Sequence, residues 1–259
     1  MTEFVQPQVS KRVCSYCGEP GKLTKEHIWP ASIIRRVADR ASYNPKAGKL
    51  LWTEMVISDV CGPCNNGPLS TLDAYGAELY DKYFSNYYLG DEPLTFEYDY
   101  QRLAKWLLKL SFNAARANQS DHVRLAQYRH SFLNANCDLP EDLSIAVDLL
   151  KPEAIDPEKE PVLPASNRIC RIAFSAPIDD WCTVRLVAIN SFYFWILIQD
   201  VPDTQVNWDH AKAVLSKIHG TRLDEKSTFA VLGSSGARIL GVHSQWAEAL
   251  RNTKFPERK

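Results

Sequence analysis

The sequence has no apolar run long enough to cross a membrane. Its longest apolar run lies around residues 192–198, far short of the roughly 20 apolar residues that span a bilayer. Residues 1–12 also lack the apolar segment that marks a secretory signal. We therefore expect a cytoplasmic protein with no membrane partner.

The sequence also has almost no net charge, with a formal value of −1 at pH 7. A balance this close to neutral gives no global electrostatic argument for binding nucleic acid. The distribution is uneven, because residues 1–50 carry nine lysines and arginines against four acidic residues, a surplus of five that leaves −6 for the remainder. This basic segment is compatible with a local phosphate-binding surface, and also with chance.

The seven cysteines are an odd number, which argues against a disulfide framework. Three of them, Cys137, Cys170 and Cys182, stand alone among apolar or loop residues. We expect these three to be small buried side chains. The other four form two matched pairs, and this pairing favours metal ligation.

Cys14 and Cys17 form one pair, and Cys61 and Cys64 form the other. The two-residue gap within each pair lets both thiolates reach one ion, and four such sulfurs make the closed tetrahedral shell of a structural zinc. The alternative is that the two cysteine pairs are accidental and do not mark a zinc site. The interval between the pairs is wide, so a segment is inserted there. A closed shell has no open position, so this zinc would not itself carry out catalysis.

The chain shows no internal repeat, and its 45% hydrophobic and 24% charged residues are typical of a folded globular protein. Residues 13–66 are rich in Gly, Pro, Cys and Asn, as in a small metal-stabilised module. Apolar residues at helical spacing predict helices over 68–85, 100–118 and, more weakly, 122–134. The apolar face of the second helix would consist of Leu103, Trp106, Leu107, Leu110 and Ala114.

The second half of the chain predicts mainly strands after a proline-rich loop or linker at 151–167. The expected elements are strands at 169–174, 183–189, 192–199, 228–232 and 237–242, a hairpin turn at Asn190-Ser191, a turn at 233–236, and helices at 208–218 and 244–252. The aromatic run at 192–195 should lie in the core of a sheet. We predict an α+β fold: a zinc-stapled module over 1–95, then a helical segment and an antiparallel sheet with helices over 96–259.

Between the cysteine pairs lies the dipeptide Glu26-His27. Adjacent residues on a regular strand point to opposite faces, so both can serve one site only at a strand end or a distortion. Alone, such a dipeptide is more often a surface or packed pair. Asn65 follows the second cysteine pair at the mouth of the predicted helix, where its amide oxygen could bind a metal or orient a ligand.

The order C-x-x-C, Glu-His-Ile-x-Pro, then C-x-x-C-Asn before a helix resembles the HNH endonucleases, whose catalytic unit is the ββα-metal fold. It is similar in particular to the zinc-stapled branch in which asparagine replaces the final histidine. The match covers residues 14–73. Taken residue by residue, the resemblance implies that His27 is the general base and that Glu26 and Asn65 are ligands of a catalytic divalent ion.

Two positions depart from the family's pattern. Glu26 stands where the family often has aspartate or histidine. The central asparagine, which pins the loop and helps to orient the base, is absent from residues 55–57. The neighbours that could take its place are Glu54, Ser58 and Asp59. Asp73, farther along the helix, is either an extra ligand or a buried partner.

The implied reaction is metal-dependent hydrolysis of phosphodiester bonds in DNA. His27 would take a proton from water, because an imidazole exchanges protons near neutral pH. The all-oxygen ligands favour Mg²⁺ or Mn²⁺, which would offset the charge that builds up at the scissile phosphate. Lys25, Arg35 and Arg36 are either phosphate contacts or part of a solvated charged face.

After residue 95 no catalytic motif stands out. We expect the histidines there on the surface or in the core; they are His122, His130, His210, His219 and His243. This region could recognise DNA, bind a regulatory protein partner or a small signal, or support the nuclease. Three hypotheses remain: an HNH nuclease, with antiviral defence against foreign DNA as one use; a catalytically inactive zinc-stapled module that binds nucleic acid or a partner; and a structural subunit whose zinc module docks a partner.

Overall fold

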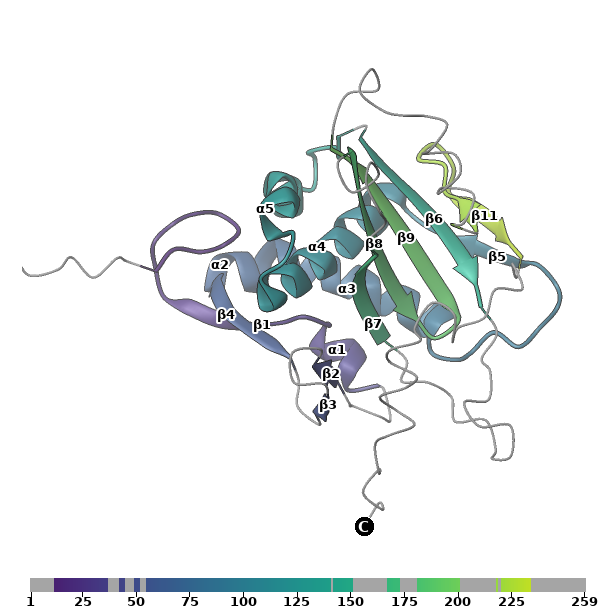
Figure 1. Cartoon of the computed structure of the whole chain (residues 1–259), viewed down its shortest axis with the longest axis horizontal. Coiled ribbons are helices and arrows are strands. Elements are labelled where there is room, and N and C mark those ends of the chain that lie inside the picture. Colours follow the sequence, from purple (N-terminus) through teal and green to yellow (C-terminus); the bar gives the residue numbers. More distant parts are fainter. Residues whose placement is uncertain are drawn as a thin grey trace, which may run out of the picture.

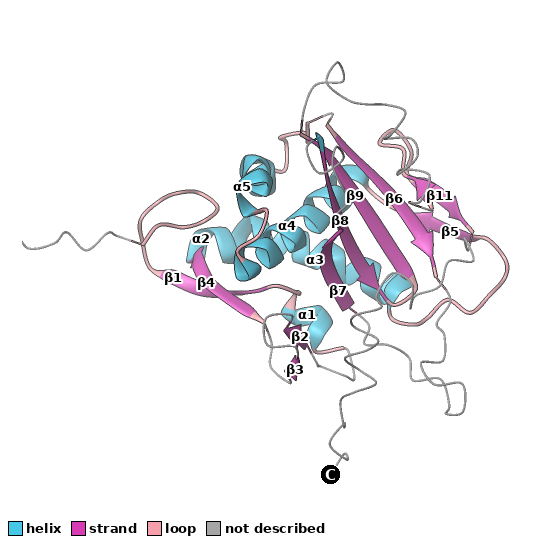
Figure 2. Ribbon diagram, viewed as in Figure 1, coloured by secondary structure: helices cyan, strands magenta, loops and turns pink. Residues whose placement is uncertain are grey.

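The computed structural model describes residues 12–36, 42–44, 49–51, 55–140, 142–150, 167–172, 181–200, 218 and 220–233. Helices and antiparallel sheets both occur among them, which confirms the predicted α+β class (Figures 1 and 2). The helical segments are α1 (Ala31–Ile34), α2 (Gly62–Cys64), η1 (Asn65–Leu69), α3 (Ser70–Leu79), η2 (Tyr80–Phe84), α4 (Tyr100–Asn118), α5 (His122–Leu125), η3 (Ala126–Tyr128) and α6 (Arg129–Leu133). The strands are β1 (Leu23–His27), β2 (Ser42–Asn44), β3 (Lys49–Leu51), β4 (Val56–Cys61), β5 (Leu94–Glu97), β6 (Leu143–Leu149), β7 (Asn167–Ile172), β8 (Cys182–Ile189), β9 (Phe192–Gln199), β10 (Thr221–Arg222) and β11 (Phe229–Leu232).

Strands β1 and β4 form an antiparallel pair, and the chain becomes helical directly after β4. The helical path runs through α2, η1, α3 and η2, so it begins at Gly62, earlier than the helix predicted over 68–85. Gly67 interrupts it with φ −104° and ψ −110°. Pro68 follows the interruption, as expected of a residue that prefers the first turn of a helix. The antiparallel pair is thus followed by a helical segment, with α1, β2 and β3 lying between its two strands in the chain.

The largest sheet has five antiparallel strands in the order β10-β6-β9-β8-β7. Strands β8 and β9 form the predicted hairpin, and Asn190 in its turn has a φ of 49°, a left-handed conformation that asparagine tolerates. The aromatic run at 192–195 is buried, as predicted. Strand β6 was not expected, although its apolar residues alternate along the chain.

Two other strands show where local patterns are insufficient. The strand expected at 228–232 is present as β11, and it pairs with β5, which the apolar pattern did not predict. Strand β7 confirms the first part of the strand predicted at 169–174. The helix predicted over 122–134 consists of three short segments, α5, η3 and α6.

Helix α4 lies between the β1–β4 pair and the five-stranded sheet, and contacts both (Figures 1 and 2). Its bounds match the helix predicted over 100–118. Asp99 caps its N-terminus by accepting a hydrogen bond from the Arg102 N–H (3.0 Å), and Gln119 ends it with a φ of 53°. The predicted apolar face is buried in full: Leu103, Trp106, Leu107, Leu110 and Ala114.

Helices α3 and α4 pack closely because Gly76 has no side chain. A Cβ at that position would overlap the indole of Trp106, which is fully buried. A single hydrophobic cluster extends from Cys14 to Leu232 and therefore crosses residue 95. The N-terminal module and the residues that follow it share one core.

Several expectations lie outside the described residues: the lead-in at 1–11, Glu54, the linker at 151–166, the end of the strand at 173–174, nearly all of the helix at 208–218, the turn after Gly233, the strand at 237–242, the helix at 244–252, and His210, His219 and His243. Among the described residues, no helix is both long and apolar enough to cross a membrane.

Candidate functional site

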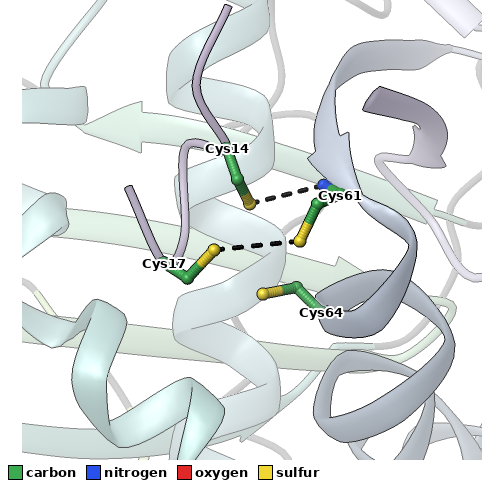
Figure 3. A group of neighbouring side chains, drawn as sticks. All are labelled: Cys14, Cys17, Cys61 and Cys64. Atoms are coloured by element: carbon green, nitrogen blue, oxygen red, sulfur yellow. Dashed lines mark hydrogen bonds between the residues drawn. The ribbon is translucent and has the colours of Figure 1, made fainter. Parts of the chain in front are cut away.

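The four paired cysteines converge on one point (Figure 3). Cys14 and Cys17 lie in the loop before β1, Cys61 ends β4, and Cys64 ends α2. All four Sγ atoms lie within 4.8 Å of one another, and the Sγ atoms of Cys17 and Cys61 are 3.8 Å apart. Tetrahedral zinc with Zn–S bonds of about 2.3 Å requires sulfurs roughly 3.8 Å apart. The donor set and its spacing therefore fit a structural zinc, as predicted.

The backbone around the cluster favours thiolate at one of these positions. The Cys61 N–H donates to the Cys14 Sγ (3.3 Å). Burial would raise the pKa of Cys14, but backbone N–H groups more than offset this and lower the pKa to about 7. Burial raises the pKa of Cys64 instead. That thiol needs the charge of a bound cation to become a thiolate.

Glu26 and His27 end strand β1 just beyond an irregularity in its register. Glu26 lies opposite Ile57 and His27 opposite Val56, and the register shifts between Thr24 and Glu26. The two residues of the dipeptide are themselves in regular register, so it is the position at the strand end that would allow both side chains to serve one site. Glu26 is buried at 4% exposure, whereas His27 is partly exposed.

Glu26 does not stand alone: it shares the ammonium group of Lys109 with Asp73. The Lys109 Nζ lies 2.5 Å from Glu26 Oε1 and 2.7 Å from each carboxylate oxygen of Asp73. Burial alone would lower the pKa of Lys109, but the two carboxylates more than offset this and hold it above its ordinary value. Asp73 is thus a half-buried partner of Lys109. Ligating a metal would require it to release Lys109.

Asn113, on α4, contacts both members of the dipeptide. Its Nδ2 donates to Glu26 Oε1 and to the main-chain oxygen of His27, each at 3.2 Å. Its Oδ1 accepts from the Tyr16 hydroxyl (2.6 Å) and from Arg116 Nη2 (3.0 Å). Tyr16 lies between Cys14 and Cys17, so this amide connects the first cysteine pair to the end of β1.

Asn65 lies beside the same strand. Its Nδ2 donates to Thr24 Oγ1 and to the main-chain oxygen of Lys25, both at 2.9 Å. The amide hydrogens are thus used by β1, and the amide oxygen is the donor atom that a metal could use. The arrangement brings Asn65 to the residue immediately before Glu26, although the two lie far apart in the sequence.

The remaining predicted residues have other positions. Asp59 pairs with Arg116 (3.0 Å) and accepts from the Ser15 hydroxyl (2.7 Å), so it anchors the first cysteine loop and does not contact the His27 backbone. Arg36 pairs with Asp81 (2.9 Å). Lys25, Arg35 and Ser58 are exposed.

The polar residues of α4 were missed by the sequence analysis of this site. Lys109, Asn113 and Arg116 follow helical spacing along a polar side that flanks the predicted apolar face. Such a side is ordinarily solvated, yet Lys109 and Asn113 are fully buried. The sequence offered only a weak signal of this burial: the polar side of α4 carries cations and an amide but no glutamate or aspartate.

Comparisons of the chain with family models, with curated proteins and with solved structures found no match. A functional assignment therefore rests on the motifs and on the geometry of these residues.

Proposed function

We propose that this chain is a metal-dependent endonuclease of the HNH type that hydrolyses phosphodiester bonds in DNA. One observation carries the proposal. The β1–β4 pair and the helical segment after it bring Asn65 to within 2.9 Å of the Lys25 carbonyl, directly before Glu26 and His27. The cysteine cluster lies in the same module, where a structural zinc would hold the loop before β1 against the end of β4.

In this proposal His27 is the general base. It lies at the end of its strand and is partly exposed. A water molecule and a phosphodiester would approach the ring from this end of the strand. The ring would accept a proton from the water as the oxygen attacks phosphorus, and the bond to the leaving oxygen would break. Glu26, the neighbour of His27 in β1, and Asn65, which is bound to the Lys25 carbonyl, would supply oxygen atoms near it.

Those oxygens suit a hard divalent ion. Glu26 uses Oε1 for Lys109 and Asn113, and Asn65 uses both amide hydrogens for β1. As far as the described residues go, each therefore keeps one oxygen for a ligand. We assign Glu26 and Asn65 as the residues that would hold Mg²⁺ or Mn²⁺. When bound, such an ion supplies positive charge at the scissile phosphate.

A second candidate function is a catalytically inactive zinc-stapled module that binds nucleic acid or a protein partner. The observation in its favour is Lys109, whose ammonium already neutralises Glu26 at 2.5 Å. An internal cation at this carboxylate weakens the requirement for a metal there.

Cleavage of plasmid DNA separates the two functions. We expect the purified protein to nick or cut DNA with Mg²⁺ or Mn²⁺, and His27→Ala to lose activity by about 10²–10⁴-fold, the usual contribution of a general base. His130→Ala is the matched control, because His130 is an exposed histidine on α6. A near-normal rate in His27→Ala would move the base elsewhere, and an inactive wild type on DNA and RNA would favour the binding module.

Brief chelation tests whether the two metal sites differ. EDTA should abolish cleavage while zinc remains in its thiolate shell, and Mg²⁺ or Mn²⁺ alone should restore the rate. Glu26→Gln and Asn65→Ala should each raise the metal concentration needed for half-maximal rate. Activity that follows zinc content and ignores added Mg²⁺ would contradict the assignment of separate sites.

A further inference from the structure

We propose that Asn113, on helix α4, is the positioning residue that fixes His27. Asn113 lies outside the segment 14–73 that carries the nuclease motifs. The inference rests on the proposed function for its catalytic consequence, but its structural content concerns only how the end of β1 is held.

The hydrogen bonds of Asn113 determine the orientation of its amide. Both Nδ2 hydrogens are used, by Glu26 Oε1 and by the His27 carbonyl, and Oδ1 accepts from Tyr16 and Arg116. Two donors and two accepted bonds are the full capacity of a carboxamide. The opposite orientation would place the amide oxygen against a carboxylate and a carbonyl.

Tyr16 ensures that this orientation persists. Tyr16 is buried, and its hydroxyl donates to Asn113 Oδ1 at 2.6 Å. Arg116 donates to the same oxygen and stacks over the Tyr16 ring, with its guanidinium carbon 4.8 Å from the centroid. The amide is thereby held from the side opposite Glu26 and His27.

The backbone at His27 is then held from two directions. The Ile28 N–H donates to the Met55 carbonyl (3.0 Å), which ties the chain to the residue before β4. The His27 carbonyl accepts from Asn113, which ties it to α4. A displacement of a base by about 1 Å can cost on the order of 10²-fold in rate. Because Asn113 does not touch substrate, its loss should lower the rate constant and leave substrate binding unchanged.

The test uses Asn113→Ala and the nearly isosteric Asn113→Asp in the full chain. We expect kcat for DNA cleavage to fall by about tenfold to a hundredfold while KM changes less than twofold. Lys105→Met is the matched control: Lys105 is a buried lysine of the same helix, and among the described residues its ammonium contacts only the carbonyls of Asn134 and Ala135. It should leave kcat unchanged even if stability falls.

The effect must also pass through His27. In a His27→Ala background, Asn113→Ala should cause no further loss of rate, because there is no ring left to position. A further loss of the same size as in wild type would overturn the proposal, as would a rise in KM with kcat unchanged.

A readout that needs no activity keeps this proposal distinguishable from the proposed function. The NMR signal of the His27 ring Cε1–H should shift and broaden in Asn113→Ala, and should keep its wild-type position in Lys105→Met. If the His27 signal changes in this way but the protein cleaves no nucleic acid, the positioning role of Asn113 stands and the proposed nuclease function fails. An unchanged His27 signal in folded Asn113→Ala would overturn the positioning role whatever the activity. If Asn113→Ala does not fold, Tyr16→Phe, which removes only the hydroxyl that orients the amide, should show the same changes to a smaller degree.

Discussion

Lys109 shows how strongly one buried charge can depend on its partners. Its side chain is fully buried, and transfer of an ammonium group from water into a protein interior costs several kcal/mol even after relaxation. The two carboxylates that surround it, those of Glu26 and Asp73, offset this cost at distances of 2.5–2.7 Å. The triad joins β1, α3 and α4, so it connects the motif-bearing module to the helix behind it.

Removal of this cation should be costly. We expect Lys109→Met to lower the free energy of unfolding by about 3–5 kcal/mol, because two carboxylates remain close together without their counter-charge. Urea unfolding followed by circular dichroism would measure the change.

Lys105→Met provides the comparison for Lys109→Met. Within the described part of the chain the Lys105 ammonium contacts only carbonyl oxygens, so the loss of stability in Lys105→Met should be smaller. Added Mg²⁺ should stabilise Lys109→Met more than wild type if the freed carboxylates form a cation site. Equal losses in the two lysine variants would show that the triad adds no special stability.

At the scale of elements, the β1–β4 pair depends on contacts at both of its ends. The cysteine cluster lies at the end where β4 passes into α2, and the Glu26–His27 dipeptide ends β1 at the opposite end of the pair. The short strands and the loop before them have few apolar residues of their own. A metal that joins this loop to β4 would replace the core that so small a unit cannot build.

We therefore expect the purified protein to contain about one zinc per chain. Cys61→Ser should lose that zinc and lower the melting temperature, because the shell loses one of its four thiolates. Elemental analysis by mass spectrometry alongside thermal unfolding would measure both.

Cys137→Ser is the control for Cys61→Ser. Cys137 lies outside the cluster and contacts Ser131, so this variant should retain the metal. Folded wild-type protein without zinc would contradict the assignment of the cluster.

At the scale of the whole molecule, the core does not divide at residue 95. The hydrophobic cluster includes residues of the first module, of α4 and of the five-stranded sheet. Polar contacts also cross this point. Lys109 pairs with Glu26 and Asp73, Asn113 donates to Glu26, and Arg116 pairs with Asp59. The residues that carry the motifs thus pack into the same core as α4 and the five-stranded sheet.

A fragment of residues 1–95 should therefore fail to fold, even with zinc. It would expose the apolar surface that α3 buries against α4, and would leave Glu26 and Asp73 without Lys109. A two-dimensional amide NMR spectrum with poor dispersion is the expected result, against a dispersed spectrum of the full chain. A well-dispersed spectrum of the zinc-loaded fragment would show that the module is an independent domain.

Much of this arrangement could be predicted from local patterns. The α4 bounds follow from apolar spacing, and the β8–β9 hairpin follows from two alternating runs around Asn190. The cysteine cluster follows from two-residue gaps that suit one ion. Each of these depends on residues that are near neighbours in the chain, or on a coordination chemistry that tolerates few alternatives.

Pairings between distant segments could not be predicted in this way. The partner of β11 is β5, and β6 lies beside β9, because strand order is decided by which faces must be buried together. The same holds for Glu26: the sequence marks it as a carboxylate before a histidine, but says nothing of Lys109.

By itself, the sequence determined the α+β class, the paired cysteines and the dipeptide that carries the proposed chemistry. Only the tertiary structure decided that the polar side of α4 is buried against that dipeptide. The physical reason is that a lysine and an asparagine on a helix have the pattern of a solvated face until oppositely charged and hydrogen-bonding partners arrive from elsewhere in the chain. Those partners, Glu26, Asp73 and the His27 carbonyl, come from segments that only the fold brings to α4.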